Sequence, residues 1–249
     1  MSTTAHFILI ALVLCASAQA QTPAGQGKKK GLAGWSGEHR AKVGAVWYYN
    51  WGPKPDGNAG AAEFVPMVKG PNFEWQLAEA RKITGPGKNL LGFNEPERAS
   101  QGNLTVERAI ELWPKLMETG ARLGSPATSS DGAGMAWLER FMAEVEKRKL
   151  RVDFIAVHWY RSADPAAFED WLKELDRKYR RPVWITEFNG WKVGEREHER
   201  FMKGAVRALE RLSFVERYAY FTWSPGQPGS LFKADLSLSK VGEIYRAAD

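Results

Sequence analysis

The sequence predicts an α/β fold, a (β/α)8 barrel of the TIM type. Short apolar runs that favour strands alternate with longer amphipathic runs that favour helices from residue 43 to the C-terminus, which is typical of a parallel sheet with helices outside it. Two of the strand-like runs end in a glutamate, Glu95 and Glu187. The chain between them fits about three barrel units of roughly 30 residues each, so both glutamates belong to one barrel.

The predicted strands are apolar runs rich in β-branched and aromatic residues and bounded by Gly, Pro or polar residues. In order, they cover residues 43–50, 63–68, 90–95, 123–128, 152–160, 182–187 and 218–223. The predicted helices cover residues 71–83, 106–122, 135–149, 165–179, 195–211 and 241–247. Two helix starts are well marked, because Thr105 is a good N-cap and Asp164 precedes Pro165 at the first helical position.

Glu95 and Glu187 are candidate catalytic residues because each ends an apolar strand. In a barrel, the C-terminal ends of the strands form the active-site face. Two carboxylates that face each other there are what glycoside hydrolysis requires. A salt-bridged or solvated side chain is the alternative for either glutamate alone, but the matching context of the two favours catalysis.

Four short segments carry a resemblance to a known family: Gly92–Pro96, Val157–Tyr160, Trp184–Phe188 and Phe221–Ser224. In this order they resemble the catalytic domain of glycoside hydrolase family 128, and the resemblance runs from about residue 43 to residue 245. It implies a barrel from a clan of retaining hydrolases and an endo-β-1,3-glucanase activity. Because Asn-Glu-Pro alone is a weak motif, the resemblance rests on the ordered set of four.

The clan has its acid/base on strand four and its nucleophile on strand seven, so the resemblance implies that Glu95 is the general acid/base and Glu187 the nucleophile. Retention of configuration then needs carboxyl groups about 5–5.5 Å apart. Glu95 must be protonated to act as the acid, and we expect apolar surroundings and the neighbouring carboxylate to raise its pKa. Only two clear strands precede Glu95, so we expect a compressed first half with a degenerate strand within residues 52–70, or an incomplete barrel.

Aromatic residues at strand ends, or in the loops that follow, are candidate platforms for stacking sugar rings, with core packing as the alternative for each. They are Trp47, Tyr48, Trp51, Trp159, Tyr160, Trp191 and Trp223. Four further tryptophans are assigned to packing. Trp184 has the opposite strand parity to Glu187, so we expect it to point outward. Trp75, Trp113 and Trp171 lie in helical patterns and are expected in the core.

Three polar residues complete the predicted substrate site: Asn50, Asn94 and His158. Asn94 is expected to bond the sugar 2-hydroxyl, a contact that strengthens in the transition state. A residue that stabilises its own turn is the alternative. His158 ends a strand and is expected to orient Glu187 or to bind a hydroxyl, with a structural histidine as the alternative.

Composition and charge exclude several classes of function. The chain of 249 residues is 44% hydrophobic and 26% charged, as expected of one globular domain. Its net charge is +6, but Lys and Arg alternate with Glu along helices, which is typical of solvated helix faces and not of a nucleic-acid interface. No metal-ligand spacing occurs, so we expect no metal and no cofactor. We expect a monomer with β-1,3-glucan as its partner and no nucleic-acid or membrane partner.

Residues 1–20 are predicted to be a secretory signal peptide, with an apolar run and a small-residue cleavage pattern at Ala18–Ala20. Cleavage there would remove Cys15, the only cysteine, so the mature chain would have no disulfide. Residues 21–34 are predicted to be a flexible tail and residues 35–249 a single barrel domain. We therefore expect a secreted protein, extracellular or periplasmic.

Two other functions stay open at this point. One is a hydrolase of another β-glycan, because the catalytic pair does not set the linkage. The other is a catalytically inactive glycan-binding barrel, because the sequence does not show that the glutamates are correctly placed. Endo or exo action also stays open, since it depends on whether the site is a groove or a closed pocket.

Overall fold

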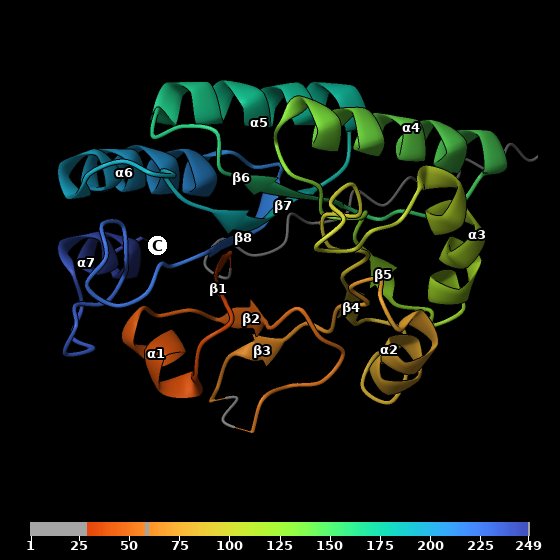
Figure 1. Cartoon of the computed structure of the whole chain (residues 1–249), viewed down its shortest axis with the longest axis horizontal. Coiled ribbons are helices and arrows are strands. Elements are labelled where there is room, and N and C mark those ends of the chain that lie inside the picture. The colour runs from red at the N-terminus through yellow and green to blue at the C-terminus, as the bar shows by residue number, and fades with distance from the viewer. Residues whose placement is uncertain (1–28, 58–59, 249) are drawn as a thin grey trace, which may run out of the picture.

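The computed structural model describes residues 29–57 and 60–248, and within them it contains eight strands and seven helices (Figure 1). The strands are β1 (Lys30–Ala33), β2 (Trp47–Tyr49), β3 (Glu63–Phe64), β4 (Asn89–Leu90), β5 (Arg122–Leu123), β6 (Ile155–Trp159), β7 (Val183–Phe188) and β8 (Val215–Tyr220). The helices are α1 (Gly37–Lys42), α2 (Phe73–Ala80), α3 (Val106–Met117), α4 (Gly132–Arg148), α5 (Pro165–Tyr179), α6 (Glu195–Arg211) and α7 (Lys240–Arg246). No helix in this part of the chain is long and apolar enough to cross a membrane.

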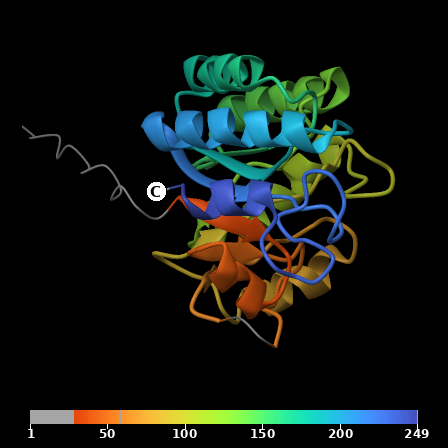
Figure 2. The same cartoon turned by 90° about the vertical axis from the view of Figure 1, so that its left-hand side faces the viewer.

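The strands close into a parallel barrel. One sheet has the order β3-β2-β1-β8-β7-β6, and β4 and β5 form a second pair. Isolated parallel bridges join the two, Met67 with Leu91 on one side and Gly124 with Phe154 on the other. The helices lie outside this ring, so that in Figure 2 the strands run between α4, α5 and α6 on one side and α1 and α2 on the other. The predicted α/β barrel is confirmed. Glu95 follows β4, and Glu187 belongs to β7.

The strand missing from the sequence prediction is β1, which lies between β2 and β8. The prediction of a flexible tail over residues 21–34 is therefore wrong for residues 30–33. Lys29 and Lys30 led to this prediction, but each buries its stem. Lys29 Nζ donates to three carbonyl groups at the end of α6, at 3.0–3.1 Å, and Lys30 Nζ donates to three at the end of α7, at 2.5–3.3 Å. Cations are favourable at these unpaired carbonyls. The predicted signal peptide and Cys15 lie outside the described residues.

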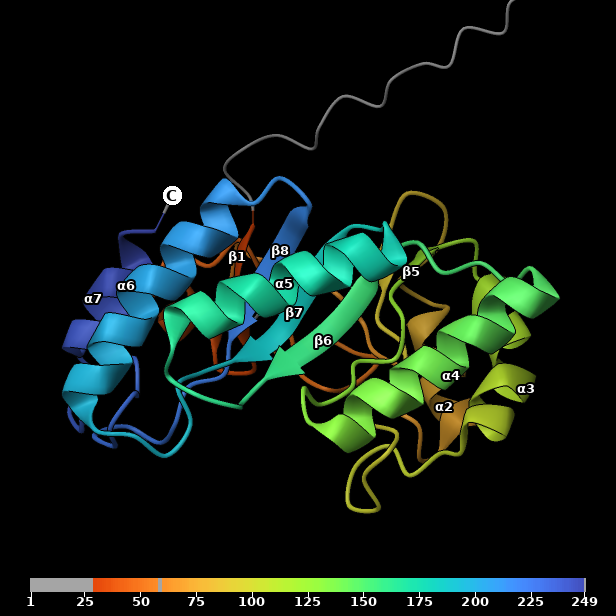
Figure 3. The ribbon, with the colours of Figure 1, turned by 90° about the horizontal axis from the view of Figure 1, so that it is seen from above.

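The longest predicted helices match the structure best. Residues 165–179 and 195–211 are helical with the predicted bounds. Thr105 caps α3 by accepting from Arg108 N at 3.2 Å, and Asp164 caps α5. Helix α3 ends at Met117, five residues earlier than predicted, and Gly120 turns the chain in the left-handed region (φ 71°) toward β5. Figure 3 shows α5 and α6 side by side on the outside of the barrel, where they contact β7 and β8.

Inside the barrel, an apolar plug fills the space toward the N-terminal ends of the strands. Its buried members are Ala33, Trp47, Tyr49, Val65, Met67, Leu91, Phe154, Trp184 and Ala219. The rings of Phe154 and Trp184 stack with their centroids 4.2 Å apart. Because Trp47 and Trp184 precede Tyr49 and Glu187 on their parallel strands, the plug lies beneath the glutamates and closes the barrel there.

Trp184 therefore points into the barrel, and its predicted outward position is wrong. The cause is a bulge in β7: the register shifts between Ile185, which pairs with Val157, and Glu187, which pairs with His158. The extra residue, Thr186, reverses the alternation so that positions 184 and 187 share the inner face. Trp113 and Trp171 are buried as predicted, whereas Trp75 is 52% exposed and is not a core residue.

Candidate active site

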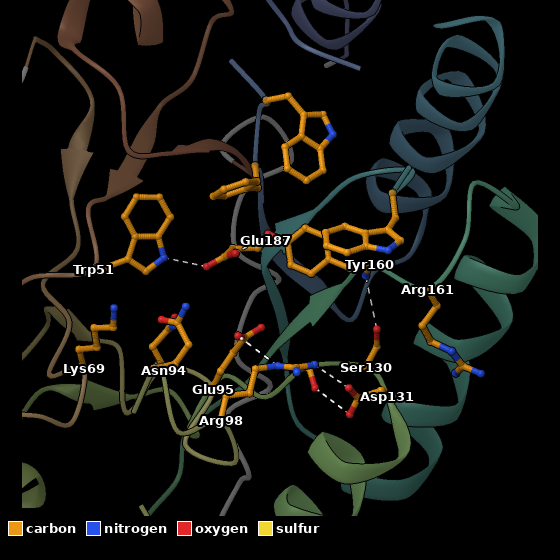
Figure 4. Close-up of a pocket in the computed structure, with 15 residues that line it drawn as sticks. Trp51, Lys69, Asn94, Glu95, Arg98, Ser130, Asp131, Tyr160, Arg161 and Glu187 are labelled. Atoms are coloured by element: carbon orange, nitrogen blue, oxygen red, sulfur yellow. Dashed lines mark hydrogen bonds and ion pairs between the residues drawn. The ribbon is translucent and has the colours of Figure 1, made fainter. Parts of the chain in front are cut away.

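A cavity of about 790 Å³ opens at the C-terminal ends of the strands (Figure 4). Glu95 and Glu187 both reach into it, from β4 and β7. The residues that line it are Trp51, Lys69, Asn94, Glu95, Arg98, Gln101, Ser129, Ser130, Asp131, Tyr160, Arg161, Glu187, Trp191, Phe221 and Trp223. The two carboxylates thus share one solvent-filled space with both aromatic and hydrogen-bonding groups around it.

Glu187 lies within β7, and three donors hold its carboxyl group. Its Oε1 accepts from Tyr49 Oη at 2.8 Å and from Trp51 Nε1 at 2.7 Å, and its Oε2 accepts from Tyr160 Oη. Burial and the charge of Glu187 raise the pKa of Tyr49 and of Tyr160 well above the usual range, so both phenols remain donors. Three donors directed at one carboxyl group fix its orientation.

Glu95 stands on a turn beyond the short strand β4. Its backbone N–H donates to Ala127 O at 2.7 Å, and its φ of 38° lies in the left-handed region, which is uncommon for a residue with a side chain. Its Oε1 lies 3.0 Å from His158 Nδ1 and its Oε2 lies 3.4 Å from Arg98 Nε. Arg98 also pairs with Asp131 at 2.6 Å, so the cation that faces Glu95 is itself anchored.

His158 lies between the two glutamates. Its side chain is fully buried, with Nδ1 toward Glu95 and Nε2 3.3 Å from Glu187 Oε1, a charge contact without hydrogen-bond geometry. Burial by itself would lower the pKa of His158, but the charge of Glu187 and the hydrogen bond and charge of Glu95 outweigh it, and the pKa is raised. One imidazole ring thus spans the gap between both carboxylates.

The pKa of Glu95 corrects the sequence prediction, because it is lowered and not raised. Burial does raise it, as predicted, but the hydrogen bond and charge of His158 and the charge of Arg98 outweigh that effect. The prediction considered the apolar surroundings and the second carboxylate but not the histidine between the two.

Aromatic side chains form one wall of the cavity. Tyr160 lies against Trp191 with ring centroids 5.4 Å apart, and Trp191 lies against Trp223 at 5.6 Å. Phe221 touches Trp51, Tyr160 and Trp223 edge to face. Trp191 is 37% exposed, so its ring is open to a ligand. The structure therefore brings Trp51, Tyr160, Trp191 and Trp223 together with Asn94, as the predicted site requires.

Other residues of the predicted sugar site lie elsewhere. Trp47 belongs to the plug beneath the site. Tyr48 points outward, and the Arg40 guanidinium lies 3.4 Å from the centroid of the Tyr48 ring. Trp159 also points outward, against helix α5. Neighbouring strand residues face opposite sides, so Tyr48 and Trp159 cannot share the inner face with Tyr49 and His158. These three aromatics are buried and do not line the cavity, which corrects their assignment to sugar stacking.

Asn50 is likewise absent from the lining, because its side chain stabilises its own turn. Its Oδ1 accepts from Gly52 N at 3.2 Å and its Nδ2 donates to Lys54 O at 2.9 Å. His158 is fully buried and is not in the lining either. Its predicted alternative of binding a sugar hydroxyl directly is therefore not supported by its position.

Several residues of the site were not predicted, and some had a usable signal. Tyr49, which donates to Glu187, stands two residues before the predicted Trp51, so the inward face of β2 indicates it. Phe221 stands two residues before Trp223 in the same way. By contrast, Lys69, Gln101 and Arg161 stand in loops whose course the sequence pattern does not specify. In residues 29–57 and 60–248, no group of three or more His, Cys, Asp or Glu side chains is arranged to hold a metal ion.

Known proteins resemble this chain over most of its length. The family model described as glycosyl hydrolase catalytic core matches residues 29–245. The chain is 32% identical over 243 residues to the alkali-sensitive linkage protein 1 of Schizosaccharomyces pombe, a match that covers 87% of this chain. It spans only 44% of the length of that curated relative.

Three solved structures are similar over their whole length. An endo-β-1,3-glucanase of family GH128 subgroup I from Amycolatopsis mediterranei, in complex with laminaritriose, is 37% identical with a TM-score of 0.80 and covers 90% of this chain and 100% of its own. A subgroup II endo-β-1,3-glucanase from Sorangium cellulosum is 26% identical with a TM-score of 0.76, covering 89% and 98%. A curdlan-specific exo-β-1,3-glucanase of subgroup III from Blastomyces gilchristii is 33% identical with a TM-score of 0.74, covering 90% and 100%.

Proposed function

This chain belongs to glycoside hydrolase family 128, and on that premise we propose that it cleaves β-1,3-glucan internally, with retention, using Glu95 as the general acid/base and Glu187 as the nucleophile. The observation that carries the proposal is the placement of these two carboxyl groups at the ends of β4 and β7, in one cavity and in contact with the same imidazole. A single imidazole ring contacts both carboxyl groups.

In the first step, the proton of Glu95 passes to the glycosidic oxygen as the bond from that oxygen to C1 breaks. A carboxylate oxygen of Glu187 bonds to C1, which gives a covalent glycosyl ester. In the second step, Glu95 takes a proton from water, the water oxygen bonds to C1, and Glu187 departs as a carboxylate. The donors of Tyr49, Trp51 and Tyr160 keep the nucleophile aimed through both steps.

Stacking of sugar rings on the aromatic wall supports a glycan substrate. The wall of Tyr160, Trp191, Phe221 and Trp223 lines the same cavity as the two glutamates. Asn94 Oδ1 is buried and has no partner among the described residues, which leaves it free to accept from a sugar hydroxyl. The Amycolatopsis enzyme has been solved with laminaritriose, laminaripentaose and laminarihexaose, and this likeness favours β-1,3-glucan over other β-glycans.

Internal cleavage is favoured by the same comparisons. The chain is 37% identical to the subgroup I endo-acting enzyme with a TM-score of 0.80, against 33% and 0.74 for the exo-acting subgroup III enzyme.

We infer secretion from residues 1–20, and a mature protein that begins after Ala20 would support it when its N-terminus is sequenced.

The test is product release by the purified protein from linear β-1,3-glucan, mixed-linkage glucan, cellulose and mannan, with Glu187→Gln as the matched control. A ladder of oligosaccharides from linear β-1,3-glucan, absent in the control, is the expected result. Glucose as the sole early product would instead indicate exo action. Release from another polymer would overturn the substrate, and binding without turnover would favour a glycan-binding barrel.

A further inference from the structure

Glu95 needs a proton to act as the general acid, yet its surroundings favour the carboxylate. Its two oxygens face Arg98 at 3.4 Å and His158 at 3.0 Å. Arg98 does not release a proton in proteins, whereas an imidazole titrates near neutral pH. Of these two groups against the Glu95 carboxyl, His158 is therefore the one that can supply a proton.

The environment of His158 is built to hold that proton. Its ring is completely buried, so water does not screen the charges that face it. Glu95 lies against Nδ1 from the turn after β4, and Glu187 lies against Nε2 from β7. The titratable and charged groups around this ring are Glu95, Glu97 and Glu187, with Tyr49, Tyr160 and Arg98 beyond them. Three acids, two from the turn after β4 and one from β7, thus oppose the cost of burying the charged imidazole.

We propose that His158 stores on Nδ1 the proton that Glu95 delivers, and that the charge on Glu187 governs when it is released. This inference rests on the proposed retaining function and deepens it. His158 acts through the two glutamates and does not touch the substrate, so it is a positioning residue. Its raised pKa is in line with this role but is not needed for it, since the contacts alone place the imidazole ring between the two carboxylates.

The proton balance closes over one turnover. In glycosylation, a proton moves from His158 Nδ1 to Glu95 and on to the departing oxygen, while the oxygen–C1 bond breaks and Glu187 bonds to C1. The ester on Glu187 carries no charge, so His158 loses one of the anions that favoured its charged form. In deglycosylation, Glu95 takes a proton from water and returns it to Nδ1 as Glu187 regains its negative charge.

Steady-state kinetics of His158→Gln test the proposal with two aryl β-laminaribiosides, one with a good and one with a poor leaving group. A poor leaving group needs the acid, so we expect kcat to fall by about 10²-fold or more with it, within the range of general acid–base catalysis, and far less with the good one. The alkaline limb of kcat/KM should move to lower pH by about one unit, because the stored proton is no longer held by two anions. His39→Gln is the matched control: its ring packs against Trp35 and Phe232, away from both glutamates.

Equal losses on both substrates with an unchanged alkaline limb would overturn the proposal and leave His158 a spacer. If the wild type releases neither aglycone, the proposed function fails and the inference fails with it, and this outcome is distinct from the first. Nitrogen NMR of His158 in the wild-type protein removes any dependence on folding of the variant. We expect the imidazolium signal at neutral pH to become that of a neutral ring once a 2-deoxy-2-fluoro glycosyl group traps Glu187, and an unchanged signal would contradict the proposal.

Discussion

The barrel has a first half, β1–β5, and a second half, β6–β8, and each supplies one glutamate and holds it in a different way. In the second half, β6, β7 and β8 have five or six residues each, and Glu187 lies within β7 under three hydrogen-bond donors. In the first half, β4 and β5 have two residues each, and Glu95 lies on a turn beyond β4. The proposed nucleophile is thus fixed by neutral donors. The proposed acid/base is held by Arg98, whose charge is permanent, and by His158, whose charge can respond.

The short strands of the first half approach each other closely at two glycines. A Cβ on Gly92 would lie 2.9 Å from Gly124 O and 3.1 Å from the Trp113 ring, and one on Gly124 would lie 2.5 Å from the Phe154 ring. This close approach lets the bridge from Gly124 to Phe154 connect the two halves. The backbone at Glu95 therefore follows a closely packed pair of short strands, whereas the backbone at Glu187 belongs to a longer strand.

The largest effect is expected from Glu187→Gln. Without the nucleophile no glycosyl ester forms, and we expect kcat to fall by about 10⁶-fold, the scale seen when other enzymes lose a nucleophile. The loss should be the same for good and poor leaving groups. Initial rates on aryl laminaribiosides measure it, and a residual rate that depends on the leaving group would contradict the role of Glu187.

Glu95→Gln should be milder and should depend on the leaving group. The acid contributes about 10²–10⁴-fold, so we expect a loss of that size with a poor leaving group and a small one with a good leaving group. Added azide should attack the ester that accumulates and give a β-glycosyl azide. If azide gives no product while the ester accumulates, Glu95 is not the base of the second step.

Tyr160→Phe tests the donors that hold the nucleophile. Loss of one hydrogen bond to a charged group costs about 1.5–3 kcal/mol, so we expect kcat/KM to fall about 10- to 100-fold. Tyr179→Phe is the matched control, because the buried Tyr179 hydroxyl has no partner among the described residues. Equal kinetics for the two variants would show that the bond from Tyr160 to Glu187 does not matter for turnover.

Gly92→Ala should disturb the first half alone. The added methyl group has no room between β5 and Trp113, and overpacking of this kind costs about 1–3 kcal/mol. Urea unfolding measures the free energy, and Gly132→Ala is the control because nothing lies within 4 Å of its Cβ position. If the backbone shift moves Glu95, rates with poor leaving groups should fall more than rates with good ones. Equal falls would show that the position of Glu95 does not depend on the packing at Gly92.

Much of the fold was predictable from local sequence patterns, because many of its helices and strands are determined by residues within them or next to them. The bounds of α5 and α6 were predictable from their caps and periodicity, and Glu95 and Glu187 from the strands that lead to them. Strand β1 was not, because Lys30 is buried only through carbonyl groups more than 200 residues later in the chain. No pattern within residues 21–34 contains that information.

The site was predicted less completely, and the reasons lie in strand parity. The bulge at Thr186 turned Trp184 inward, and the alternation along β2 placed Tyr48 outside the barrel and Tyr49 against Glu187. The role of His158 between the glutamates depends on three strands meeting, and this also reversed the predicted direction of the Glu95 pKa.

The most direct test of the account is proton NMR of laminarihexaose during its cleavage by the purified protein. The anomeric signals of the newly formed reducing ends are followed before mutarotation equilibrates them. A retaining double displacement through Glu187 predicts that the β-anomer appears first. If the α-anomer appears first, the reaction inverts and Glu187 is not a covalent nucleophile, which would contradict the account.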